Sequence, residues 1–383
     1  MKVAWFEPIG GHGGNDFYNF GYCQALYSGG VEVIFYTCNE TRIDENITVE
    51  FTIKKYFSNI YSGNIVGRAF RYLYGLLRTS IDILKNDIEI IHVHIYHASM
   101  LEFIVLIIFN LLNKKIICTL HDIESFAKHV NKKKTTLKNL LNLSHKIILH
   151  SNTSKKIFFN KYPTYNKAKV YQINHFDKDV VFNKPISQKV ARNKLDINFD
   201  GIVFLFFGQI KEVKGVDVLL EAVYKLNKKN EKDFKVIIAG KYWKTDKDLY
   251  LKVINEFGIR DKIILRTSFI KNELVPYYFA AADAVVLPYK KIYNSGVLLR
   301  SIDYNSLIIA SDLELMKEFI THNENGLLFK CNDPDSLADK MFYVLNLSKE
   351  EINRMKANLT NFNQVNYSYE IIYKQLMDVY TSK

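Results

Sequence analysis

One segment of the sequence reads Phe206-Phe207-Gly208-Gln209-Ile210-Lys211-Glu212-Val213-Lys214-Gly215-Val216-Asp217 and joins two regular elements. The apolar run Ile202 to Phe207 is typical of a strand that is covered on both faces. A helix is predicted after the segment, because apolar residues recur there every three or four positions. These are Val216, Leu219, Leu220, Val223 and Leu226. Open α/β sheets bind ligands at such loops, and Gly208, Lys211 and Lys214 suit a phosphate, although an ordinary turn with solvated lysines is the alternative.

Strand-like and helix-like runs alternate on both sides of this segment. In the first half the predicted strands are Val3–Phe6, Val31–Tyr36, Ile88–Val93, Lys115–Leu120, Lys146–His150 and Lys169–Ile173. In the second half they are Ile202–Phe207, Phe234–Ala239, Lys262–Arg266, Ala284–Leu287, Leu307–Ala310 and Leu327–Phe329. This alternation predicts an α/β fold with two Rossmann-like domains, each built on a mostly parallel sheet.

The domain boundary is predicted within the polar segment 177–200, which contains Pro185. We expect a first domain over residues 1–180, a second over residues 181–360, and a carboxyl-terminal helical segment over residues 361–383, with its helix from Asn361 to Tyr380. Two domains that face each other leave a central cleft, and such interfaces are usual ligand sites.

The composition indicates which class of protein this is. With 383 residues, 48% hydrophobic and 24% charged, the chain has the balance of a two-domain globular protein. The formal net charge of +12 indicates an anionic partner, which could be a nucleotide, a phospholipid surface or nucleic acid. Nucleic acid is disfavoured, because the sequence contains no zinc knuckle, RNA-recognition signature or basic heptad dimer.

The cysteines and the apolar segments favour a cytoplasmic protein. Cys23, Cys38, Cys118 and Cys331 lie far apart and are predicted to be free thiols in a reducing compartment. The start, Met1 to Phe6, enters a strand directly and lacks the regions of a signal peptide. The longest apolar run, Ile104 to Leu112, is too short to span a bilayer.

A second glycine loop, Gly10 to Gly14, follows the first predicted strand. Gly11, Gly13 and Gly14 would let the backbone approach a ligand closely, and Asn15 or Asp16 can cap the next helix. A dinucleotide site is disfavoured, because the spacing is not Gly-x-Gly-x-x-Gly and no acidic residue clearly ends the second strand. A flexible turn without a ligand is the alternative.

Polar residues end the predicted strand Lys115–Leu120. His121 can hydrogen-bond a reacting group, and Asp122 could act as a base on a hydroxyl group, or the two could be structural. His92 and His94 share one face of the preceding strand, but nothing nearby in the sequence completes a ligand set. We therefore expect no metal site.

These segments together resemble the motifs of glycosyltransferase family 4, whose fold is GT-B. The donor-phosphate loop of that family runs Gly-Arg, four residues, then Lys-Gly. Gly208, Lys214 and Gly215 match it, while Gln209 stands where the family usually has arginine. Gly10 to Gly14 is similar to the first glycine loop, Thr119 to Asp122 to the Thr-x-His-Asp stretch, and Glu318 with Asn325 to Phe329 to the Glu…Asn-Gly-Leu-Leu segment. The resemblance implies two Rossmann-like domains with a last helix that crosses back to the first.

The resemblance also implies the site residues. His121 and Asp122 would be catalytic. The donor-binding residues would be Gly11, Gly13, Gly14, Gly208, Gln209, Lys211, Lys214, Ser295, Gly296, Val297, Arg300 and Glu318. One departure concerns the paired glutamates, separated by seven residues, that bind the donor in the family. Neither is present here, and the position of the second falls on Arg300 or Ser301.

The activity that the resemblance implies is metal-independent transfer of a sugar from a nucleotide-diphosphate sugar. The acceptor would be a glycan or a lipid-linked saccharide in bacterial surface polysaccharide synthesis, with no cofactor besides the nucleotide sugar as co-substrate. Gln209 and the missing glutamates leave two alternatives open. These are a catalytically weak GT-B-like binding partner of another transferase and a GT-B sugar-nucleotide epimerase.

A basic and aromatic segment, Asn64 to Lys85, raises the question of a membrane. Arg68, Arg71 and Arg78 lie there among apolar and aromatic residues, which is the composition of a helix that can sit in a headgroup layer. Lys132 to Lys134 add a second basic cluster. Peripheral contact with an anionic membrane, at the inner face of the cell membrane, is one interpretation, and a solvated basic face on a core-packed helix is the other.

Overall fold

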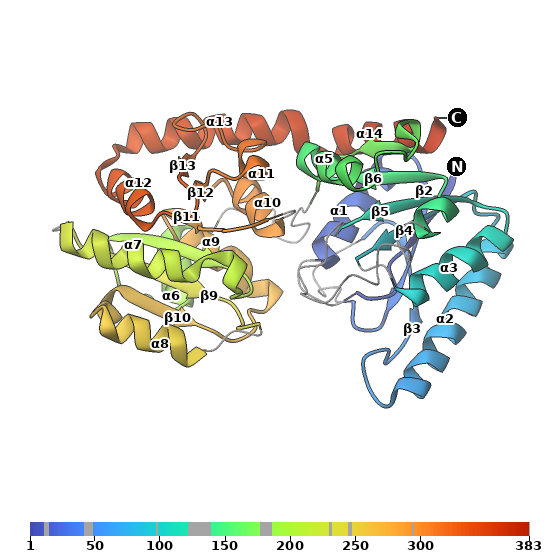
Figure 1. Cartoon of the computed structure of the whole chain (residues 1–383), viewed down its shortest axis with the longest axis horizontal. Helices are drawn as coiled ribbons and strands as arrows, with labels where there is room; N and C mark the ends of the chain where they lie inside the picture. Colours follow the sequence, from blue (N-terminus) through green and yellow to red (C-terminus); the bar gives the residue numbers. More distant parts are fainter. Residues whose placement is uncertain are drawn as a thin grey trace. The chain divides into compact units, whose positions relative to one another are not determined.

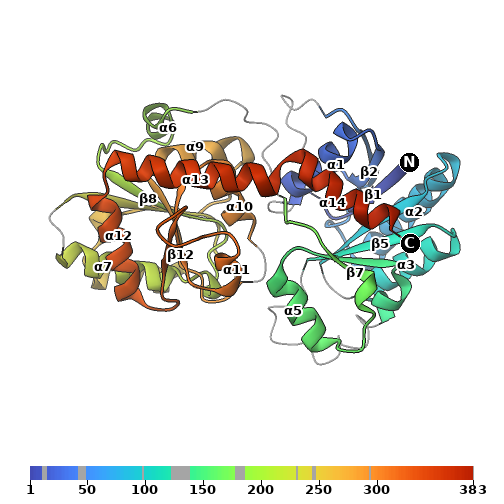
Figure 2. The ribbon, with the colours of Figure 1, turned by 90° about the horizontal axis from the view of Figure 1, so that it is seen from above.

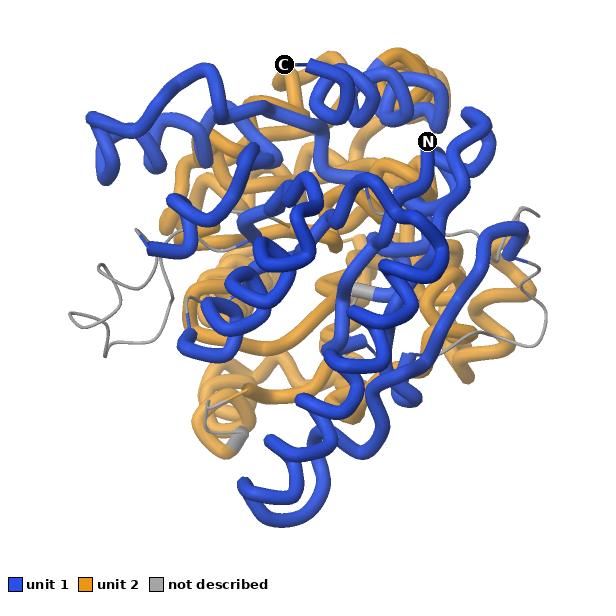
Figure 3. The backbone as a smooth tube through the Cα atoms, turned by 90° about the vertical axis from the view of Figure 1, so that its right-hand side faces the viewer, with its two compact units in different colours: residues 1–181, 366–383 blue, residues 182–365 orange. Residues whose placement is uncertain are grey.

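The computed structural model describes residues 1–10, 15–41, 49–96, 99–121, 139–176, 186–229, 232–243, 247–292 and 295–382 (Figure 1). The chain forms two compact units. Unit 1 comprises Met1–Val181 together with Asn366–Lys383, and unit 2 comprises Phe182–Val365. Figure 3 colours the two units separately and shows that the carboxyl-terminal segment belongs to unit 1.

The sheet of unit 1 is parallel and has the strand order β3-β2-β1-β4-β5-β6-β7. Its strands are β1 (Lys2–Phe6), β2 (Glu32–Cys38), β3 (Thr52–Phe57), β4 (Ile90–Ile95), β5 (Lys115–Leu120), β6 (Lys146–Leu149) and β7 (Val170–Gln172). Apart from β3, these strands contain few charged residues, as expected where helices cover both faces of a sheet.

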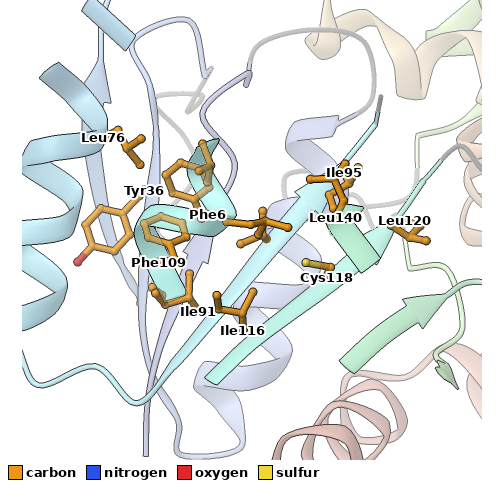
Figure 4. Packing of buried hydrophobic residues seen from close by; sticks show 14 of the residues in the cluster. Phe6, Tyr36, Leu76, Ile91, Ile95, Phe109, Ile116, Cys118, Leu120 and Leu140 are labelled. Atoms are coloured by element: carbon orange, nitrogen blue, oxygen red, sulfur yellow. The ribbon is translucent and has the colours of Figure 1, made fainter. Parts of the chain in front are cut away.

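One face of this sheet packs against α2 (Ile65–Lys85) and α3 (Met100–Leu111). Side chains alternate along a strand, so Phe6 of β1 points to this face while its neighbour Trp5 points to the other. Figure 4 shows Phe6, Tyr36 and Ile91 of the sheet gathered around Phe109 of α3, with Leu76 of α2 nearby. The result is a dry aliphatic and aromatic core on this face.

The opposite face of the sheet packs against α1 (Asn15–Ser28), and α14 (Tyr369–Thr381) lies beside α1 (Figure 2). Lysines of the sheet bond the last carbonyls of α14: Lys115 Nζ donates to Tyr380 O at 2.7 Å, and Lys146 Nζ donates to Val379 O at 3.0 Å. Cations at a helix carboxyl terminus are stabilising, so these contacts hold α14 on unit 1. The predicted return of the last helix to the first domain is therefore confirmed.

The other elements in the described part of unit 1 are short, and they are α5 (Asn152–Lys161) and the 3₁₀ turn η1 (Lys167–Lys169). The four cysteines are free, and Cys23, Cys38 and Cys118 are buried, which confirms the expectation of free thiols. No helix in the part of the chain that the structure describes is long and apolar enough to cross a membrane.

The sheet of unit 2 is also parallel, with the order β10-β9-β8-β11-β12-β13. Its strands are β8 (Ile202–Phe207), β9 (Phe234–Ala239), β10 (Ile263–Arg266), β11 (Ala284–Leu287), β12 (Leu307–Ser311) and β13 (Leu327–Phe329). Its helices are α6 (Gln188–Lys194), α7 (Val216–Lys229), α8 (Lys247–Glu256), α9 (Val275–Ala281), α10 (Gly296–Asp303), α11 (Glu314–Lys317), α12 (Pro334–Asn346) and α13 (Lys349–Tyr367), with 3₁₀ turns η2 (Glu212–Lys214), η3 (Arg260–Lys262) and η4 (Asn272–Leu274). Within the unit, α7 packs beside α12 and α6 beside α9.

The predicted α/β class with two Rossmann-like parallel sheets is thus confirmed, and the differences are local. The structure adds the strand β3, which the sequence pattern missed because Lys54 and Lys55 interrupt its apolar run. This edge strand accommodates Lys54 through an ion pair with Asp82 of α2, Nζ to Oδ2 2.6 Å. The helix expected from Asn361 to Tyr380 is in fact two helices, because the Ser368 side chain caps α14 by accepting a bond from Ile371 N.

Candidate functional site

Each sheet has one point at which the strand order reverses, and Gly208, Lys214 and Ser295 lie in the loops that follow the strands at one of these points. In unit 1 the reversal lies between β1 and β4, and in unit 2 it lies between β8 and β11. The loops after such strands separate, which opens a crevice at the carboxyl edge where α/β proteins bind ligands. The loop after β8 contains Gly208 to Gly215, and the loop after β11 leads to Ser295.

The loop after β8 is held by close backbone contacts. Gly208 has φ +113°, and its N donates to Ala239 O at 2.9 Å. A Cβ on Gly240 would lie 1.9 Å from Gly208 O, and a Cβ on Gly215, whose φ is +68°, would lie 1.8 Å from Pro288 O. Only glycine fits where two backbones approach this closely. The loop is thereby fixed to the strand ends on both sides of β8.

Lys214 lies within this loop with its amine against an aromatic face. Its Nζ is 3.6 Å from the centroid of the Tyr289 ring, a cation–π contact. Burial lowers the pKa of Lys214 to about 7, because desolvation disfavours the ammonium ion. The Tyr289 hydroxyl lies 3.5 Å from Ser295 Oγ. Lys214 therefore lies close to the start of α10.

The amino terminus of α10 faces the same loop. Ser295 is buried and caps the helix, accepting a bond from Leu298 N at 3.1 Å. A Cβ on Gly208 would lie 3.2 Å from Val297 Cγ2, which shows how closely the helix and the loop approach. Gly296 and Val297 form the first turn of α10, where unpaired backbone amides favour an anion. Arg300 lies one turn further along and is 7% exposed.

Two other residues of the predicted set lie at the rim of this loop. Gln209 is exposed, and Lys211 Nζ lies 5.4 Å from the centroid of the Trp243 ring. Trp243 follows β9, so the rim combines a cation with an aromatic side chain.

Glu318 lies at the carboxyl-terminal cap of α11, beyond β12. The Asn-Gly segment that follows is a structural turn. Asn325 Oδ1 accepts from Thr321 N at 2.8 Å, and its Nδ2 donates to Phe319 O at 3.0 Å. A Cβ on Gly326 would crowd Ile320 at 3.0 Å. These contacts explain the Asn-Gly pair by packing alone.

At the switch point of unit 1, some predicted residues cannot be placed. Gly11, Gly13, Gly14 and Asp122 lie outside the described residues. The described end of the glycine loop, Gly10, is tightly enclosed, since a Cβ there would lie 1.8 Å from Thr41 Oγ1.

His121 is the centre of an aromatic cluster at the end of β5. His121 Nε2 and His94 Nδ1 are 3.1 Å apart. The Tyr96 ring stacks on His121 with centroids 4.2 Å apart, and the Tyr18 ring meets its edge at 4.9 Å. Burial and the neighbouring histidines lower the pKa of His121 well below its usual value. At neutral pH it is therefore an uncharged imidazole held in one orientation.

Further histidines extend this cluster beneath α1. His150 Nδ1 donates to Ile173 O at 3.0 Å, so its Nε2 accepts from the Tyr18 hydroxyl at 3.0 Å. His92 lies between the Tyr380 hydroxyl, 2.6 Å from Nδ1, and Thr119 Oγ1, 2.7 Å from Nε2. Burial lowers the pKa of His92 to about 3 and that of His150 to about 4. Both imidazoles are neutral.

Glu7 is a site candidate that the sequence analysis missed. It follows β1 directly and is completely buried. Its Oε1 accepts from Ile9 N at 3.0 Å, while Oε2 has no hydrogen-bond partner among the described residues. Burial raises the pKa of Glu7 to about 8. The signal in the sequence was a lone acid at the end of an apolar strand.

His92 shares a face of β4 with His94, and both of its ring nitrogens are hydrogen-bonded. The two rings stack with centroids 4.9 Å apart, as strand spacing requires, but His92 uses both nitrogens on Tyr380 and Thr119. Among the described residues, no group of three or more His, Cys, Asp or Glu side chains is placed to hold a metal ion.

The sequence of this chain matches two family models, one over each half of the chain. Residues 13–175 match the model of Glycosyltransferase Family 4, and residues 187–362 match that of Glycosyl transferases group 1. An uncharacterized glycosyltransferase of Methanocaldococcus jannaschii is 26% identical over 227 residues, which are 55% of this chain and 61% of that protein. The chain thus spans about three fifths of the length of this curated relative.

Two solved structures show the same fold over the whole chain. A glycosyltransferase from Rickettsia africae superposes with a TM-score of 0.76 at 17% identity, covering 100% of this chain and 99% of the other. HepE of Anabaena, solved in complex with UDP, superposes with a TM-score of 0.73 at 15% identity, covering 100% of both chains. Taken with the family matches over both units, these findings show that the chain belongs to the glycosyltransferase family 4 and group 1 family, with the GT-B fold.

Proposed function

We propose that this chain transfers a sugar from a nucleotide-diphosphate sugar to a glycan or lipid-linked saccharide acceptor, in bacterial surface polysaccharide synthesis. The observation that carries the proposal is the convergence, at the β8–β11 switch point, of the Gly208 backbone, the Lys214 amine and the start of α10. Donors of this kind suit a site that combines a cation with free helix amides. The cytoplasm is the proposed location, which fits the free cysteines.

In the proposed reaction, the bond between the sugar and the diphosphate breaks, and a bond to an acceptor hydroxyl forms. The diphosphate leaves with additional negative charge, and the hydroxyl loses its proton. Lys214, Lys211 and the first turn of α10 would stabilise the leaving group as this charge develops. Because these groups supply the positive charge, we propose that the transfer needs no metal, and full activity in the presence of a chelator is the expected result.

We propose that unit 1 supplies the groups near the acceptor. His121 is neutral, so it would hydrogen-bond a sugar hydroxyl rather than carry charge. If the reaction inverts the anomeric centre, Asp122 is the proposed base. If the reaction retains it, no protein nucleophile is required, and the departing diphosphate would accept the proton of the hydroxyl.

A donor screen tests the proposal directly. The purified chain is incubated with UDP-, GDP- and dTDP-sugars and with saccharide acceptors, and release of the nucleoside diphosphate is measured. UDP-sugars lead the panel, because HepE was solved in complex with UDP-glucose. If the chain bound none of the nucleotide sugars in the panel, the proposal would be refuted. Conversion of a free UDP-sugar without an acceptor would instead reveal an epimerase.

A pair of lysine variants tests the phosphate loop. Lys214→Ala should weaken donor binding by about tenfold to a hundredfold, because a charge-assisted bond to phosphate contributes roughly 1.5–3 kcal/mol. Lys228→Ala is the matched control, since Lys228 Nζ also lies on a tyrosine ring, 4.3 Å from the Tyr224 centroid, but on α7 away from the loop. Calorimetric titration with UDP measures both variants, and equal effects would refute the assignment.

A donor-binding protein with weak catalysis is the second candidate function. It is favoured by Arg300, which is buried at one of the two positions, 300 and 301, where the family resemblance would place the second glutamate. A cation there changes the recognition of the donor ribose or sugar. Nucleotide-sugar binding without hydrolysis or transfer, across the acceptor panel, would favour this function over the enzyme.

A further inference from the structure

The long helix α2 has two apolar stripes, and only one of them is covered. Tyr72, Leu76, Thr79 and Ile83 lie on the buried stripe, and Gly75 approaches β3 so closely that a Cβ there would lie 2.7 Å from the Phe57 ring. The second stripe repeats every three or four residues, so its members share one helix face. These residues are between 44% and 73% exposed: Val66, Phe70, Leu73, Leu77, Ile81 and Leu84.

The neighbouring helix α3 repeats this arrangement. Val105, Leu106 and Phe109 are buried, while an outer stripe with the spacing of one helix face is exposed. This outer stripe is Met100, Ile104, Ile107 and Leu111. The two helices contact each other and lie side by side on one flank of unit 1 (Figure 1). Together the two outer stripes form what we call the α2–α3 face, an apolar surface of the kind that marks a contact with a partner or a lipid phase.

Basic residues line the edge of the α2–α3 face. Arg71, Arg78 and Lys85 are seven residues apart and therefore follow one line along α2. Arg71 Nε donates to Asn59 O at 3.1 Å, and Arg78 lies 4.3 Å from the centroid of the Tyr56 ring. No carboxylate bridges to these cations among the ion pairs of the described residues. The edge therefore carries net positive charge.

The acidic residues of the two helices are already engaged. Asp82 is the one acid in the sequence of α2, and it accepts from Lys54 Nζ and from the Tyr36 hydroxyl, both at 2.6 Å. Glu102 is the one acid in the sequence of α3, and it forms the capping box with Ser99. Neither carboxylate is placed to pair with the arginines of a second copy.

We propose that the α2–α3 face docks this protein onto an anionic lipid surface, with the two outer stripes in the boundary of the acyl chains and the basic line of α2 at the headgroups. A helix whose apolar stripe adjoins Arg and Lys is suited to that boundary. A symmetric contact with a second copy would instead bring two basic edges together, and the acids within α2 and α3 are already engaged. The docking does not depend on the proposed transferase activity, because lipid binding is measured without a donor.

Vesicle sedimentation with the full-length chain tests the docking. The wild-type protein should bind vesicles of phosphatidylglycerol and phosphatidylcholine, and it should bind pure phosphatidylcholine more weakly. Phe70→Glu/Leu77→Glu should lower the partition coefficient on the mixed vesicles by at least about a hundredfold, because two exposed apolar side chains lose their burial in lipid. Leu249→Glu/Phe342→Glu is the matched control, with the same charge change at exposed apolar positions of unit 2, and it should bind like the wild type.

A second variant separates the contribution of the basic residues to vesicle binding from that of the apolar stripes. Arg78→Ser/Lys85→Ser should lower binding to the mixed vesicles by roughly tenfold, and added salt should produce a similar loss. Binding of this variant to pure phosphatidylcholine should equal that of the wild type. Absent wild-type binding, or an equal loss in the Leu249/Phe342 control, would overturn the proposal. A dimer that the Phe70/Leu77 variant abolishes, without any vesicle binding, would assign the face to a second copy of the chain.

Discussion

The two sheets have the same reversal in strand order, but the groups near their switch points differ: those of unit 2 favour an anion, and those of unit 1 are buried in their neutral forms. At the β8–β11 point, unit 2 gathers a glycine backbone, Lys214 and a helix amino terminus, which together favour an anion. In unit 1, Glu7 after β1 has a raised pKa, and imidazoles with lowered pKa values lie on β4 and after β5 and β6. Burial favours the uncharged form of each of these groups.

This difference suits the two parts of the proposed reaction, which are departure of the diphosphate and binding of the acceptor hydroxyl. A leaving diphosphate needs positive charge that is already in place, because preorganised charge costs no reorganisation during the reaction. In the proposed reaction, a neutral and oriented group would hydrogen-bond the sugar hydroxyl, and the Tyr18 and Tyr96 rings packed on His121 would hold its imidazole for that role. In unit 1 the stability cost of these groups arises from burying neutral histidines, whereas in unit 2 it arises from close backbone contacts that require glycine.

The largest expected effect is a loss of stability of unit 1 in acid. His92 and His150 have folded pKa values of about 3 and about 4, below the ordinary value of 6.5. The unfolded state therefore binds more protons below pH 6.5, and stability falls as the pH falls through this range. At about pH 5 each imidazole should cost about 2 kcal/mol of unfolding free energy, or about 4 kcal/mol for the pair.

The two tryptophans of the chain make this measurable, since Trp5 lies in unit 1 and Trp243 in unit 2. In a Trp243→Phe background, Trp5 fluorescence follows urea unfolding at about pH 7.5 and about pH 5. His92→Gln/His150→Gln should reduce the pH effect of this background by about 4 kcal/mol, while the buried imidazoles of His94, His121 and His175 keep theirs. His322→Gln, at an exposed position of unit 2, is the control. An unchanged pH effect in the double variant would contradict the assignment.

The second expected effect concerns the backbone contacts of unit 2. Gly215 and Gly258 have similar dihedral angles, φ +68° and φ +62°, but a Cβ on Gly258 would meet nothing within 4 Å, whereas one on Gly215 would collide with Pro288 O. Gly258→Ala should cost about 1 kcal/mol for the left-handed backbone alone. Gly215→Ala should cost about 3 kcal/mol in all, because the loop must shift as well.

Urea unfolding monitored by circular dichroism measures both glycine variants, and UDP titration shows whether the Gly215 variant also loses donor binding. Equal costs would mean that the contact with Pro288 does not hold the loop. A Gly215 variant that keeps full UDP affinity would separate the loop geometry from donor binding.

The fold was predictable from the sequence because the buried strands are strongly apolar. Lys115–Leu120 and Ile202–Phe207 were predicted with their observed bounds. The edge strand Thr52–Phe57 was not, because an edge tolerates lysines that a central strand excludes. The break at Ser368 was also missed, since a cap inside an apolar periodic run leaves the periodicity almost unchanged.

The candidate site was predictable where glycine and charge occur together in one loop, as from Gly208 to Gly215. It was not predictable where residues distant in sequence meet. Tyr289 is 75 positions after Lys214 in the numbering, yet its ring supports the amine at 3.6 Å. Tyr18, His94 and His150 lie in different segments, and their hydrogen bonds and ring contacts exist only once the sheet is assembled. Single-sequence patterns contain no signal for such pairs.

The smallest expected effect is a pH dependence of donor binding that arises in unit 2 alone. The pKa of Lys214 is about 7, so the free site loses its charge as the pH rises through neutrality. A diphosphate favours the ammonium form, and above pH 7 its affinity should therefore fall by up to about tenfold per pH unit. Lys214→Arg should flatten this profile, because a guanidinium stays protonated, while the Lys228→Ala control keeps it. UDP titrations from about pH 6 to about pH 9 measure the profile, and a wild-type affinity that is constant over this range would show that Lys214 is not the cation that binds the phosphate.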